Sequence, residues 1–191
     1  MTANARLSAP KSGALFDELL VIMVQRGDGA ALERLYARWN SRLIRAAYRY
    51  TGDREIARDL AQECWIGILS GIGGLRDPAR FRSFAFAILH RRGADYLRVA
   101  MRRREVAEEA EHAAQPAHTS MLDDGLALGK AFAALPPDQR LTAHLHFVEG
   151  LTLDEIASVQ SIPTGTAKSR LFHARRKLKA ALTEFHEGEL T

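Results

Sequence analysis

The segment 151–180 constrains the fold of this chain more than any other, because it combines a helix–turn–helix pattern with charge on one side. Thr152 and Glu155 are spaced as a capping box, in which each side chain accepts a hydrogen bond from a free amide at a helix start. This helix is expected to end near Gln160, since Pro163 suits the first turn of a second helix, where a missing amide costs no hydrogen bond. The pattern therefore predicts two helices joined by a tight turn.

Apolar residues recur on one side of both predicted helices, where they can face a shared core. They are Leu153, Ile156, Ala157, Ile162, Ala167, Leu171 and Leu178. The opposite side of the second helix is cationic, with six basic residues and no acidic one: Lys168, Arg170, Arg175, Arg176, Lys177 and Lys179. Such a helix fits the major groove of DNA, which is flanked by phosphates. A solvated basic helix is the alternative, but the turn pattern and the absence of acids favour DNA binding.

The rest of the chain predicts an all-α fold, because apolar residues recur at helical spacing and no run alternates as a strand does. Helices are expected at about 15–26, 28–52, 53–70, 77–104, 122–134 and 135–150, ahead of the helix–turn–helix. Asp28, Asp53 and Asp77 are of a residue type that caps helix starts, and Gly52 suits a helix end. Short connections between the first four helices predict a compact bundle.

A change of composition after Arg104 divides the chain into two predicted domains. The sequence becomes acidic and Ala-rich, and from 115 to 120 it has no apolar pattern, which is typical of a linker. We therefore expect two small helical domains joined by a flexible linker. The expected divisions are a disordered N-terminus at 1–13, a four-helix domain at 14–104, a linker at 105–121, a four-helix domain with the helix–turn–helix at 122–184, and a C-terminal tail at 185–191.

The segment 90–104 is strongly basic, with six arginines and Asp95 as its one acid. Aromatic residues lie nearby, because Tyr96 is inside this segment and three phenylalanines precede it at positions 81, 84 and 86. Cations that neutralise phosphates beside aromatics that stack on bases suit opened or single-stranded nucleic acid. At least two of the phenylalanines are expected in the core, so the charge is the stronger signal.

Polar residues share one face of the helix predicted at 53–70, away from its apolar stripe. This face consists of Glu55, Asp59, Gln62, Glu63 and Ile66, with Trp65 at its margin. A solvated polar face is one interpretation. An exposed isoleucine and tryptophan beside carboxylates favour a protein contact instead.

The sequence argues against several other classes of protein. One cysteine, Cys64, excludes a disulfide framework and a multi-cysteine zinc site and favours a reducing cytoplasm. No run approaches the roughly 18 apolar residues of a membrane span, and there is no phosphate loop, nucleophile elbow or dinucleotide fingerprint. His144 and His146 are two residues apart on a predicted helix and so point to different faces, without further ligands for a metal. We therefore expect no enzyme, no cofactor, no metal and no small-molecule substrate.

Five short motifs follow one another along the chain. They are Asp59-Leu60-Ala61-Gln62-Glu63, Phe81-Arg82-Ser83-Phe84, Leu135-Pro136-Pro137 with Arg140, Glu149-Gly150-Leu151-Thr152 with Glu155-Ile156-Ala157, and Ile162-Pro163 with Gly165-Thr166 and Lys168-Ser169-Arg170-Leu171. Together they closely resemble the extracytoplasmic-function (ECF) group of bacterial sigma factors. Each motif alone is weak, but all five in this order are specific, and the resemblance covers about 14–184.

The resemblance implies an alternative sigma factor that binds core RNA polymerase and directs promoter-specific transcription initiation in the cytoplasm, in answer to a stress. The residues it assigns to the clamp of the polymerase β′ subunit are Glu55, Asp59, Gln62, Glu63 and Ile66. Those assigned to the −10 element are Arg80, Phe81, Arg82, Phe84, Arg91, Arg92, Tyr96 and Arg98, with a pocket for a flipped base in the loop 71–82. Those assigned to the −35 element are Thr166, Lys168, Ser169, Arg170, Phe172, His173 and Arg176. The resemblance also implies control by an anti-sigma factor, either membrane-anchored or soluble.

Some positions depart from the family pattern. Arg91 stands where an asparagine is usual, so the −10 sequence that the family prefers is not expected to be the one this chain reads. Gln160 and Ser161 replace an apolar residue and a glycine at the turn, and a non-glycine residue forced to positive φ costs roughly 1 kcal/mol. His173 stands where an arginine is frequent, which adds modest pH sensitivity to that −35 contact.

Two other functions fit part of the pattern. A free-standing helix–turn–helix regulator that binds an operator as a dimer explains 151–180 but leaves the basic segment 90–104 unexplained. A non-DNA adaptor with basic helices for an acidic partner predicts no sequence preference for DNA. For a sigma factor, two basic surfaces separated by a linker predict weak DNA binding by each alone and promoter recognition only on polymerase, which holds both at the right spacing.

Overall fold

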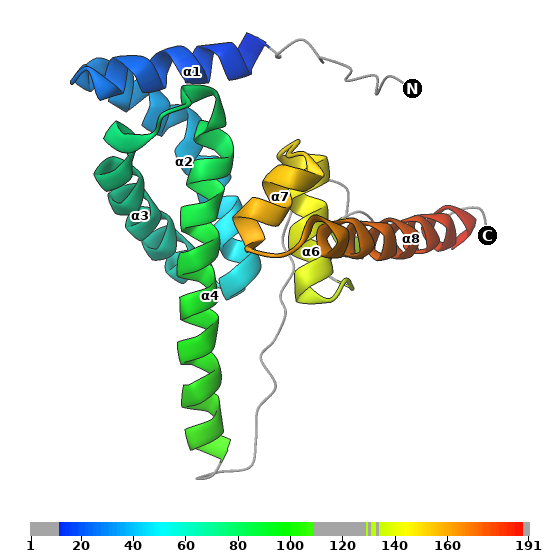
Figure 1. Ribbon diagram of the computed structural model, residues 1–191. Coiled ribbons are helices and arrows are strands. Elements are labelled where there is room, and N and C mark those ends of the chain that lie inside the picture. The colour runs from blue at the N-terminus through cyan, green and yellow to red at the C-terminus, as the bar shows by residue number, and fades with distance from the viewer. Residues whose placement is uncertain (1–11, 109–128, 130, 133, 189–191) are drawn as a thin grey trace.

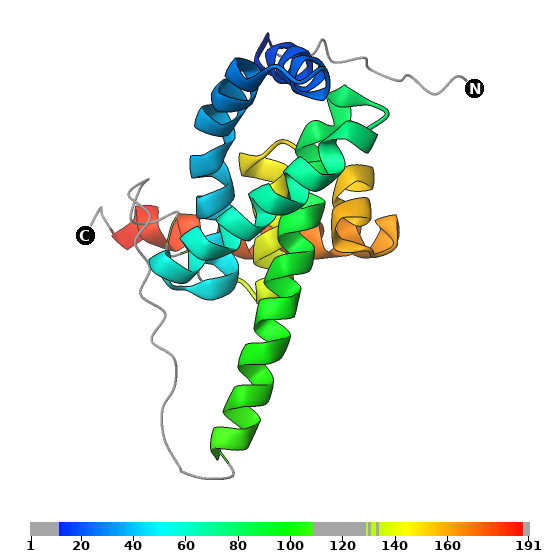
Figure 2. The ribbon, with the colours of Figure 1, turned by 90° about the vertical axis from the view of Figure 1, so that its left-hand side faces the viewer.

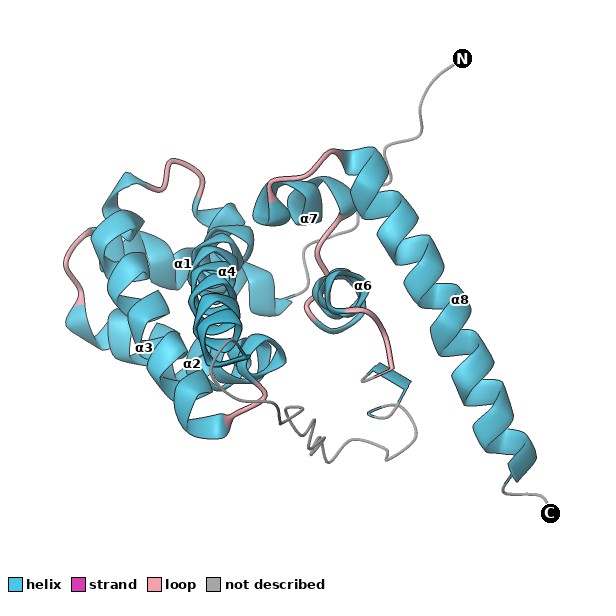
Figure 3. Cartoon of the chain, turned by 90° about the horizontal axis from the view of Figure 1, so that it is seen from below, coloured by secondary structure: helices cyan, strands magenta, loops and turns pink. Residues whose placement is uncertain are grey.

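A computed structural model describes residues 12–108, 129, 131–132 and 134–188 (Figure 1). Within these residues every regular element is a helix (Figure 3), so the predicted all-α fold is confirmed. The first domain comprises α1 (Ser12–Gln25), α2 (Gly29–Thr51), α3 (Arg54–Gly71), η1 (Ile72–Gly74), η2 (Pro78–Arg80) and α4 (Phe81–Glu108). The second domain, described from residue 129 onward, contains α6 (Pro137–Ala143), the π-helix η3 (His144–Val148), α7 (Leu153–Gln160) and α8 (Thr164–Gly188).

Aspartate side chains cap α2, α3 and η2, the 3-10 turn that leads into α4, at the three predicted positions, whereas α1 begins at Ser12, ahead of its predicted start near residue 15. Asp28 accepts a hydrogen bond from an amide of α2 at 3.0 Å, and Asp53 accepts from two amides in the first turn of α3. Asp77 caps η2 in the same way at 3.2 Å. The α2 helix ends where Gly52 adopts φ 65°, a left-handed conformation that glycine tolerates. Each aspartate cap contributes about 1 kcal/mol, because it satisfies an amide that has no partner within the helix.

Two helices extend beyond their predicted ends. α4 continues to Glu108, through the first residues of the predicted linker, and α8 continues to Gly188, past the predicted domain end at 184. Residues 105–108 of α4, Glu-Val-Ala-Glu, include alanine and glutamate, whose helix propensity favours continuation. The other parts of the predictions for the N-terminus, the linker, the helix at 122–134 and the C-terminal tail fall at 1–11, 109–128, 130, 133 and 189–191, outside the described residues.

Trp39 lies at the centre of the first domain, with 1% of its surface exposed. The ring of Phe81 meets it edge-on, with the centroids 5.1 Å apart, and the ring of Phe86 lies at 6.0 Å. Burial of each such side chain stabilises the fold by about 1.5–3 kcal/mol. α4 can approach α2 closely because Gly93 has no side chain: a Cβ there would lie 2.6 Å from the ring of Tyr50.

In the second domain, α7 and α8 form the predicted helix–turn–helix. Thr152 Oγ1 accepts from the Glu155 amide at 3.2 Å, and Glu155 Oε2 accepts from the Thr152 amide at 2.8 Å, which confirms the capping box. Ser161 adopts φ 53° in the turn, the strained conformation expected where the family has glycine. The predicted inward residues are buried at positions 156, 157, 167, 171 and 178 and partly buried at 153 and 162.

The two domains pack against each other, a contact that the sequence pattern did not predict. Figures 1 and 2 both show α7 beside α4, and α6 lies between the first domain and α8 in Figure 3. Leu145, Leu151 and Ile156 of the second domain belong to the same buried cluster as the core of the first. The described part of the chain therefore forms one closed unit.

Candidate nucleic-acid and partner interfaces

The polar face predicted on α3 is exposed. Its members Glu55, Asp59, Gln62, Glu63 and Ile66 all lie on the surface, and 63% of Ile66 is accessible. Polar side chains around an accessible isoleucine resemble the surface of a protein contact, in which a small apolar centre is surrounded by polar groups.

Trp65, by contrast, is not part of this face. It is 5% exposed, and its Nε1 donates to Asn40 Oδ1 at 3.2 Å. Its ring lies 5.0 Å from that of Tyr36, which is 44% exposed and is the aromatic residue that reaches the surface here. The prediction of an exposed tryptophan was wrong, because α2 packs against this side of α3.

The basic surface predicted on α4 is largely accessible. Arginines 80, 91, 92 and 98 are exposed, and Phe84 and Tyr96 are half-buried. Arg92 Nη1 lies 3.9 Å from Glu63 Oε2, so the basic surface of α4 adjoins the polar face of α3. Phe81 differs from the expectation, since it is 1% exposed against Trp39. Phe81 is therefore a core residue, and its ring is not available to nucleic acid in this conformation.

The loop between α3 and α4, in which a base pocket was predicted, is held from α1. Gln25 Nε2 donates to the backbone oxygens of Ile72 at 2.8 Å and Leu75 at 2.9 Å. Sequence reasoning missed Gln25, because a glutamine near a helix end gives no local signal of a contact some fifty residues away. This side chain fixes the loop backbone next to the basic surface.

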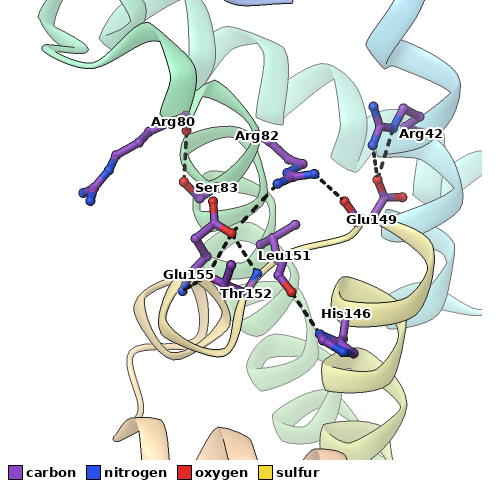
Figure 4. Close-up of polar contacts among 9 residues, drawn as sticks. All are labelled: Arg42, Arg80, Arg82, Ser83, His146, Glu149, Leu151, Thr152 and Glu155. Atoms are coloured by element: carbon purple, nitrogen blue, oxygen red, sulfur yellow. Dashed lines mark hydrogen bonds and ion pairs between the residues drawn. The ribbon is translucent and has the colours of Figure 1, made fainter. Parts of the chain in front are cut away.

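Arg82 is the member of the predicted −10 set whose contacts differ most from expectation. Its Nη1 donates to the Glu149 backbone oxygen at 2.9 Å, and its Nη2 lies 3.9 Å from Glu155 Oε2 (Figure 4). Both partners belong to the second domain. In this conformation the guanidinium group thus binds the start of the helix–turn–helix.

The predicted −35 residues lie along the first half of α8. Lys168, Ser169, Phe172, His173 and Arg176 are exposed, and Thr166 is half-buried. Ser169 Oγ donates to the Thr166 backbone oxygen at 3.0 Å. Phe172 is 61% exposed, and its ring meets that of His173 edge-on with the centroids 5.6 Å apart.

Arg170 is held inside the second domain. Its Nη2 lies 2.6 Å from Asp138 Oδ2, and its Nη1 donates to Gln160 Oε1 at 3.1 Å. Gln160 is 6% exposed, and its Nε2 donates to Thr142 Oγ1 at 3.1 Å. The glutamine that replaces an apolar residue at the turn therefore links α6, α7 and α8 through a buried polar network.

Glu149 is buried at the boundary between the domains, with 4% of its surface exposed. Its Oε2 accepts from Arg42 Nη2 at 2.6 Å and Nε at 3.1 Å, and its Oε1 lies 3.4 Å from His144 Nε2 (Figure 4 shows the Arg42 contact). Burial raises the pKa of Glu149, but His144 and the charge of Arg42 outweigh it, so this pKa lies below its ordinary value. Burial lowers the pKa of His144 despite the neighbouring carboxylate. The carboxylate is therefore charged and the imidazole neutral at neutral pH.

We call Arg42, Arg82, His144, Glu149 and Glu155 the interdomain cluster. The sequence did not predict that His144 and Glu149 lie together between the domains. His144 was considered only for a metal site, which its spacing from His146 argues against, and Glu149 only as part of a family motif. The only feature of the sequence that could have indicated this cluster is the position of Glu149, an acidic residue at the end of an apolar helix and directly before Gly150. His146 points elsewhere, as predicted, and its Nδ1 donates to the Leu151 backbone oxygen at 3.0 Å.

Among the described residues, no cluster of His, Cys, Asp and Glu has the arrangement of a metal site. Within the same ranges, the helices are too short or too polar to cross a membrane.

Residues 35–104 match the family model of sigma-70 region 2, and residues 125–178 match that of sigma-70 region 4. The first range contains the polar face of α3 and the basic surface of α4, and the second contains the helix–turn–helix. Together the two matches cover more than half of the chain, which therefore belongs to the sigma-70 family. Regions 2 and 4 of this family bind core RNA polymerase and promoter DNA.

The curated relatives point to the ECF group within that family. The chain is 32% identical over 181 residues to the RNA polymerase sigma-H factor of Pseudomonas aeruginosa, covering 87% of this chain and 93% of the relative. It is 27% identical over 182 residues to the ECF RNA polymerase sigma-E factor of Escherichia coli, covering 87% and 94%. The sigma factor family consists of transcription initiation factors that are not catalysts themselves.

Two solved structures share the fold. One is the sigma factor RpoE in complex with the anti-sigma factor NepR from Bartonella quintana, with a TM-score of 0.60, 24% identity, and coverage of 80% of this chain and 96% of that chain. The other is CnrH in complex with the cytosolic domain of CnrY, with a TM-score of 0.61, 22% identity, and coverage of 88% and 98%. At these identities the likeness concerns the fold.

Proposed function

We propose that this sigma factor reads the −10 element with the basic surface of α4 and the −35 element with the exposed first half of α8. The polar face of α3 holds the clamp of core RNA polymerase. The observation that carries the proposal is the placement of two accessible basic surfaces on separate domains, with an accessible polar face beside one of them. A free-standing regulator explains the basic surface of α8 but leaves that of α4 unexplained.

Transcription with purified components tests this function. Holoenzyme assembled from core polymerase and this chain selects promoters from a random library, and the selected DNA then serves as template for run-off transcription. We expect transcripts that require this chain and both promoter elements. Binding of the free chain to one defined duplex, with no transcript that depends on it, would instead indicate the free-standing regulator.

The polymerase contact is tested by reversing charge on α3. Gln62→Lys with Glu63→Lys is expected to weaken core polymerase binding by about tenfold, because it reverses the charge of an exposed face proposed to lie in the interface. Glu33→Lys is the matched control, since Glu33 is an exposed acid on α2 outside the proposed face. Unchanged binding of the double variant rejects the assignment of α3.

The −35 contact is better tested at Lys168 than at Arg170. Arg170→Ala also breaks the contacts with Asp138 and Gln160, so it changes the fold as well as the DNA interface. Lys168→Ala removes an exposed cation. If Lys168 binds one phosphate, the slope of log K for promoter binding against log salt concentration should fall by about 1. Lys177→Ala is the control, because Lys177 is exposed on α8 outside the proposed set.

The −10 contact is tested by measuring promoter opening directly. With Phe81 in the core, the proposed surface consists of Arg80, Arg82, Phe84, Arg91, Arg92, Tyr96 and Arg98. Arg91→Ala with Arg98→Ala should slow opening of the −10 region, reported by 2-aminopurine fluorescence, because fewer cations hold the separated strand. Arg54→Ala is the control on α3. An unchanged opening rate removes this part of α4 from the −10 interface.

We further propose that an anti-sigma protein holds this chain inactive in the cytoplasm, and that the chain acts without a cofactor or catalytic activity of its own. The anti-sigma proteins present in the two solved complexes support this regulation. A candidate inhibitor must bind the purified chain and stop its run-off transcription. A candidate that binds without affecting transcription is not the regulator.

A further inference from the structure

The loop between α3 and α4 has an exposed crest made of two glycines, Gly73 and Gly74. Neither glycine is required by the fold, because a Cβ added at either position would meet no atom within 4 Å and neither residue has a positive φ. Glycine nevertheless costs conformational entropy wherever the backbone is held in one conformation. A bare backbone is useful where another molecule approaches the main chain closely. The crest is therefore suited to a close contact with a partner.

Gln25, the last residue of α1, holds this crest from outside the loop. Its Nε2 donates to the backbone oxygen of Ile72 at 2.8 Å and to that of Leu75 at 2.9 Å. A side-chain amide has two N–H donors, so both are used here. The two acceptors lie on either side of the glycines, and one side chain therefore bridges the whole crest. Figures 1 and 2 both show the loop beside α1.

The loop is also anchored on both sides of the crest. Ile72 is 5% exposed and belongs to the core of the first domain. After the crest, Asp77 caps η2 by accepting a hydrogen bond from the Ala79 amide. Across the crest itself, the Leu75 amide donates to the Ile72 oxygen at 3.1 Å. The contacts of Gln25 add a tether from another helix to this local bond.

The tethered segment continues directly into the proposed −10 surface. Arg76 is exposed next to the crest, and Arg80 Nε lies 3.5 Å from Asp77 Oδ2 in the following turn. Ser83 Oγ of α4 donates to the Arg80 backbone oxygen at 3.0 Å (Figure 4). These contacts join the crest, η2 and the first turn of α4 into one continuous stretch. The position of the crest relative to Arg80 therefore depends on the tether.

We propose that Gln25 is a positioning residue for −10 recognition, which holds residues 72–77 in the conformation in which the glycine crest contacts the promoter. The proposal rests on the proposed function in one respect, namely that Arg80 and α4 read the −10 element. Gln25 acts through the loop backbone and does not touch DNA. A loop that is held for only part of the time has an apparent affinity lowered by that fraction. Loss of the tether should therefore weaken reading of the −10 element and leave reading of the −35 element unchanged.

Spin labelling of the free chain measures the tether without any promoter. A nitroxide is attached at Arg76→Cys, an exposed position next to Leu75. The native Cys64 is buried, and burial raises the pKa of its thiol to about 12, so the label goes to position 76. Gln25→Glu keeps the shape of the side chain without an N–H donor, and Gln25→Met also removes its polarity. In both variants the ratio of mobile to held label should rise by about tenfold, the effect of losing two hydrogen bonds.

Holoenzyme assembled from unlabelled chains measures the effect on promoter reading. Each template of the random library carries both elements, so one selection reports the base preferences at −10 and at −35 together. Gln25→Glu and Gln25→Met should each flatten the −10 preference and slow opening of the −10 region by up to about tenfold. The −35 preference should stay as it is, because α8 belongs to the other domain. A merely structural role would lower the amount of active holoenzyme and leave both preferences unchanged.

Ser70→Ala is the matched control for both variants. Ser70 is exposed at the end of α3, and its Oγ donates to the Ile66 backbone oxygen at 2.8 Å. This is also a bond from a side chain to a backbone oxygen, but it stays within one helix and does not hold the loop. Its loss should change neither the label mobility nor the −10 preference. Thermal unfolding followed by circular dichroism verifies that every variant is folded.

The outcomes separate the role of Gln25 from the proposed function. Unchanged label mobility in both folded variants overturns the proposal, and so does a mobile loop with an unchanged −10 preference and opening rate. In either case a wild-type holoenzyme that opens promoters with a −10 preference leaves the proposed function standing. A wild-type holoenzyme without that preference rejects the proposed function and this proposal with it, although the label still reports the tether.

Discussion

The two domains hold their helices together by different means. The first packs apolar side chains around Trp39, with aromatic rings at 5.1 and 6.0 Å. The second places polar groups inside: among the described residues, Thr142, His144, Glu149 and Gln160 are four of the five buried polar or charged residues. Apolar burial needs only close packing, whereas each buried polar group needs a partner in a fixed place.

The second domain therefore depends more on its surroundings than the first does. Thr142, Gln160 and Arg170 satisfy one another within that domain. Glu149, however, takes its strongest contacts from Arg42 of the first domain. A change in the contact between the domains therefore alters the polar contacts of Glu149 inside the second domain. The apolar packing around Trp39 is not affected.

The largest effect is expected from Trp39→Ala, which removes the centre of the apolar core. Loss of about 3–5 kcal/mol of unfolding free energy is expected, because a buried aromatic ring leaves a large cavity. Denaturant unfolding followed by circular dichroism measures it. Tyr36→Ala, on the same helix but 44% exposed, should cost much less. Equal losses at the two positions would break the description of the first domain as a core built on Trp39.

A smaller effect is expected from Gln160→Leu, which restores an apolar residue at the turn but removes the polar network. The variant should lose about 1–3 kcal/mol, because Thr142 and Arg170 each lose a hydrogen-bond partner. Thermal unfolding of the full chain measures this cost. A gain in stability would mean that the network contributes less than apolar packing at the same site, and the contrast between the domains would weaken.

His144 should contribute part of the pH dependence of the stability of the folded chain. Burial lowers the pKa of this histidine in the folded chain, while the unfolded chain keeps a value near 6.5. The unfolded chain therefore binds more protons below pH 6.5, so stability is fully present above that pH and is lost as pH falls toward the folded pKa.

The test is His144→Gln, which should reduce the loss of stability between pH 7.5 and 5.5, measured by denaturant unfolding at each pH. The pKa of His90 is also lowered by burial, so the variant keeps part of the slope, and His90→Gln estimates that part. Glu149, whose pKa is lowered as well, adds a loss in the same direction only below about pH 4.5. A pH profile unaltered by His144→Gln would contradict the assignment.

The smallest effect is expected at the turn between α7 and α8. Ser161→Gly should stabilise the chain by about 0.5–1 kcal/mol, because glycine adopts the observed φ of 53° without steric cost. Ser158→Gly, at an exposed position inside α7, should destabilise it by a similar amount. Thermal unfolding that shows the same sign for both changes would exclude relief of strain at the turn.

Local features of the fold could be predicted from the sequence. The caps at Asp28, Asp53 and Thr152, the turn at Ser161 and the exposed polar face of α3 depend on residues within one or two helical turns. Helix propensity also accounts for the continuation of α4 past its predicted end. The interfaces were less predictable, since helical periodicity does not tell which neighbouring helix covers a residue at the margin of a stripe. Trp65 and Phe81 are buried for that reason.

The helices, the helix–turn–helix, the two charged surfaces and the family follow from the amino-acid sequence, because hydrogen bonds and charge patterns within short segments produce them. Which of those charged side chains are bound to distant residues follows from the packing of the helices. Arg82, Arg170 and Glu149 are bound to partners 67, 32 and 107 residues away. Such pairs form when separate helices are packed together, and the spacing of residues along the chain does not specify that packing.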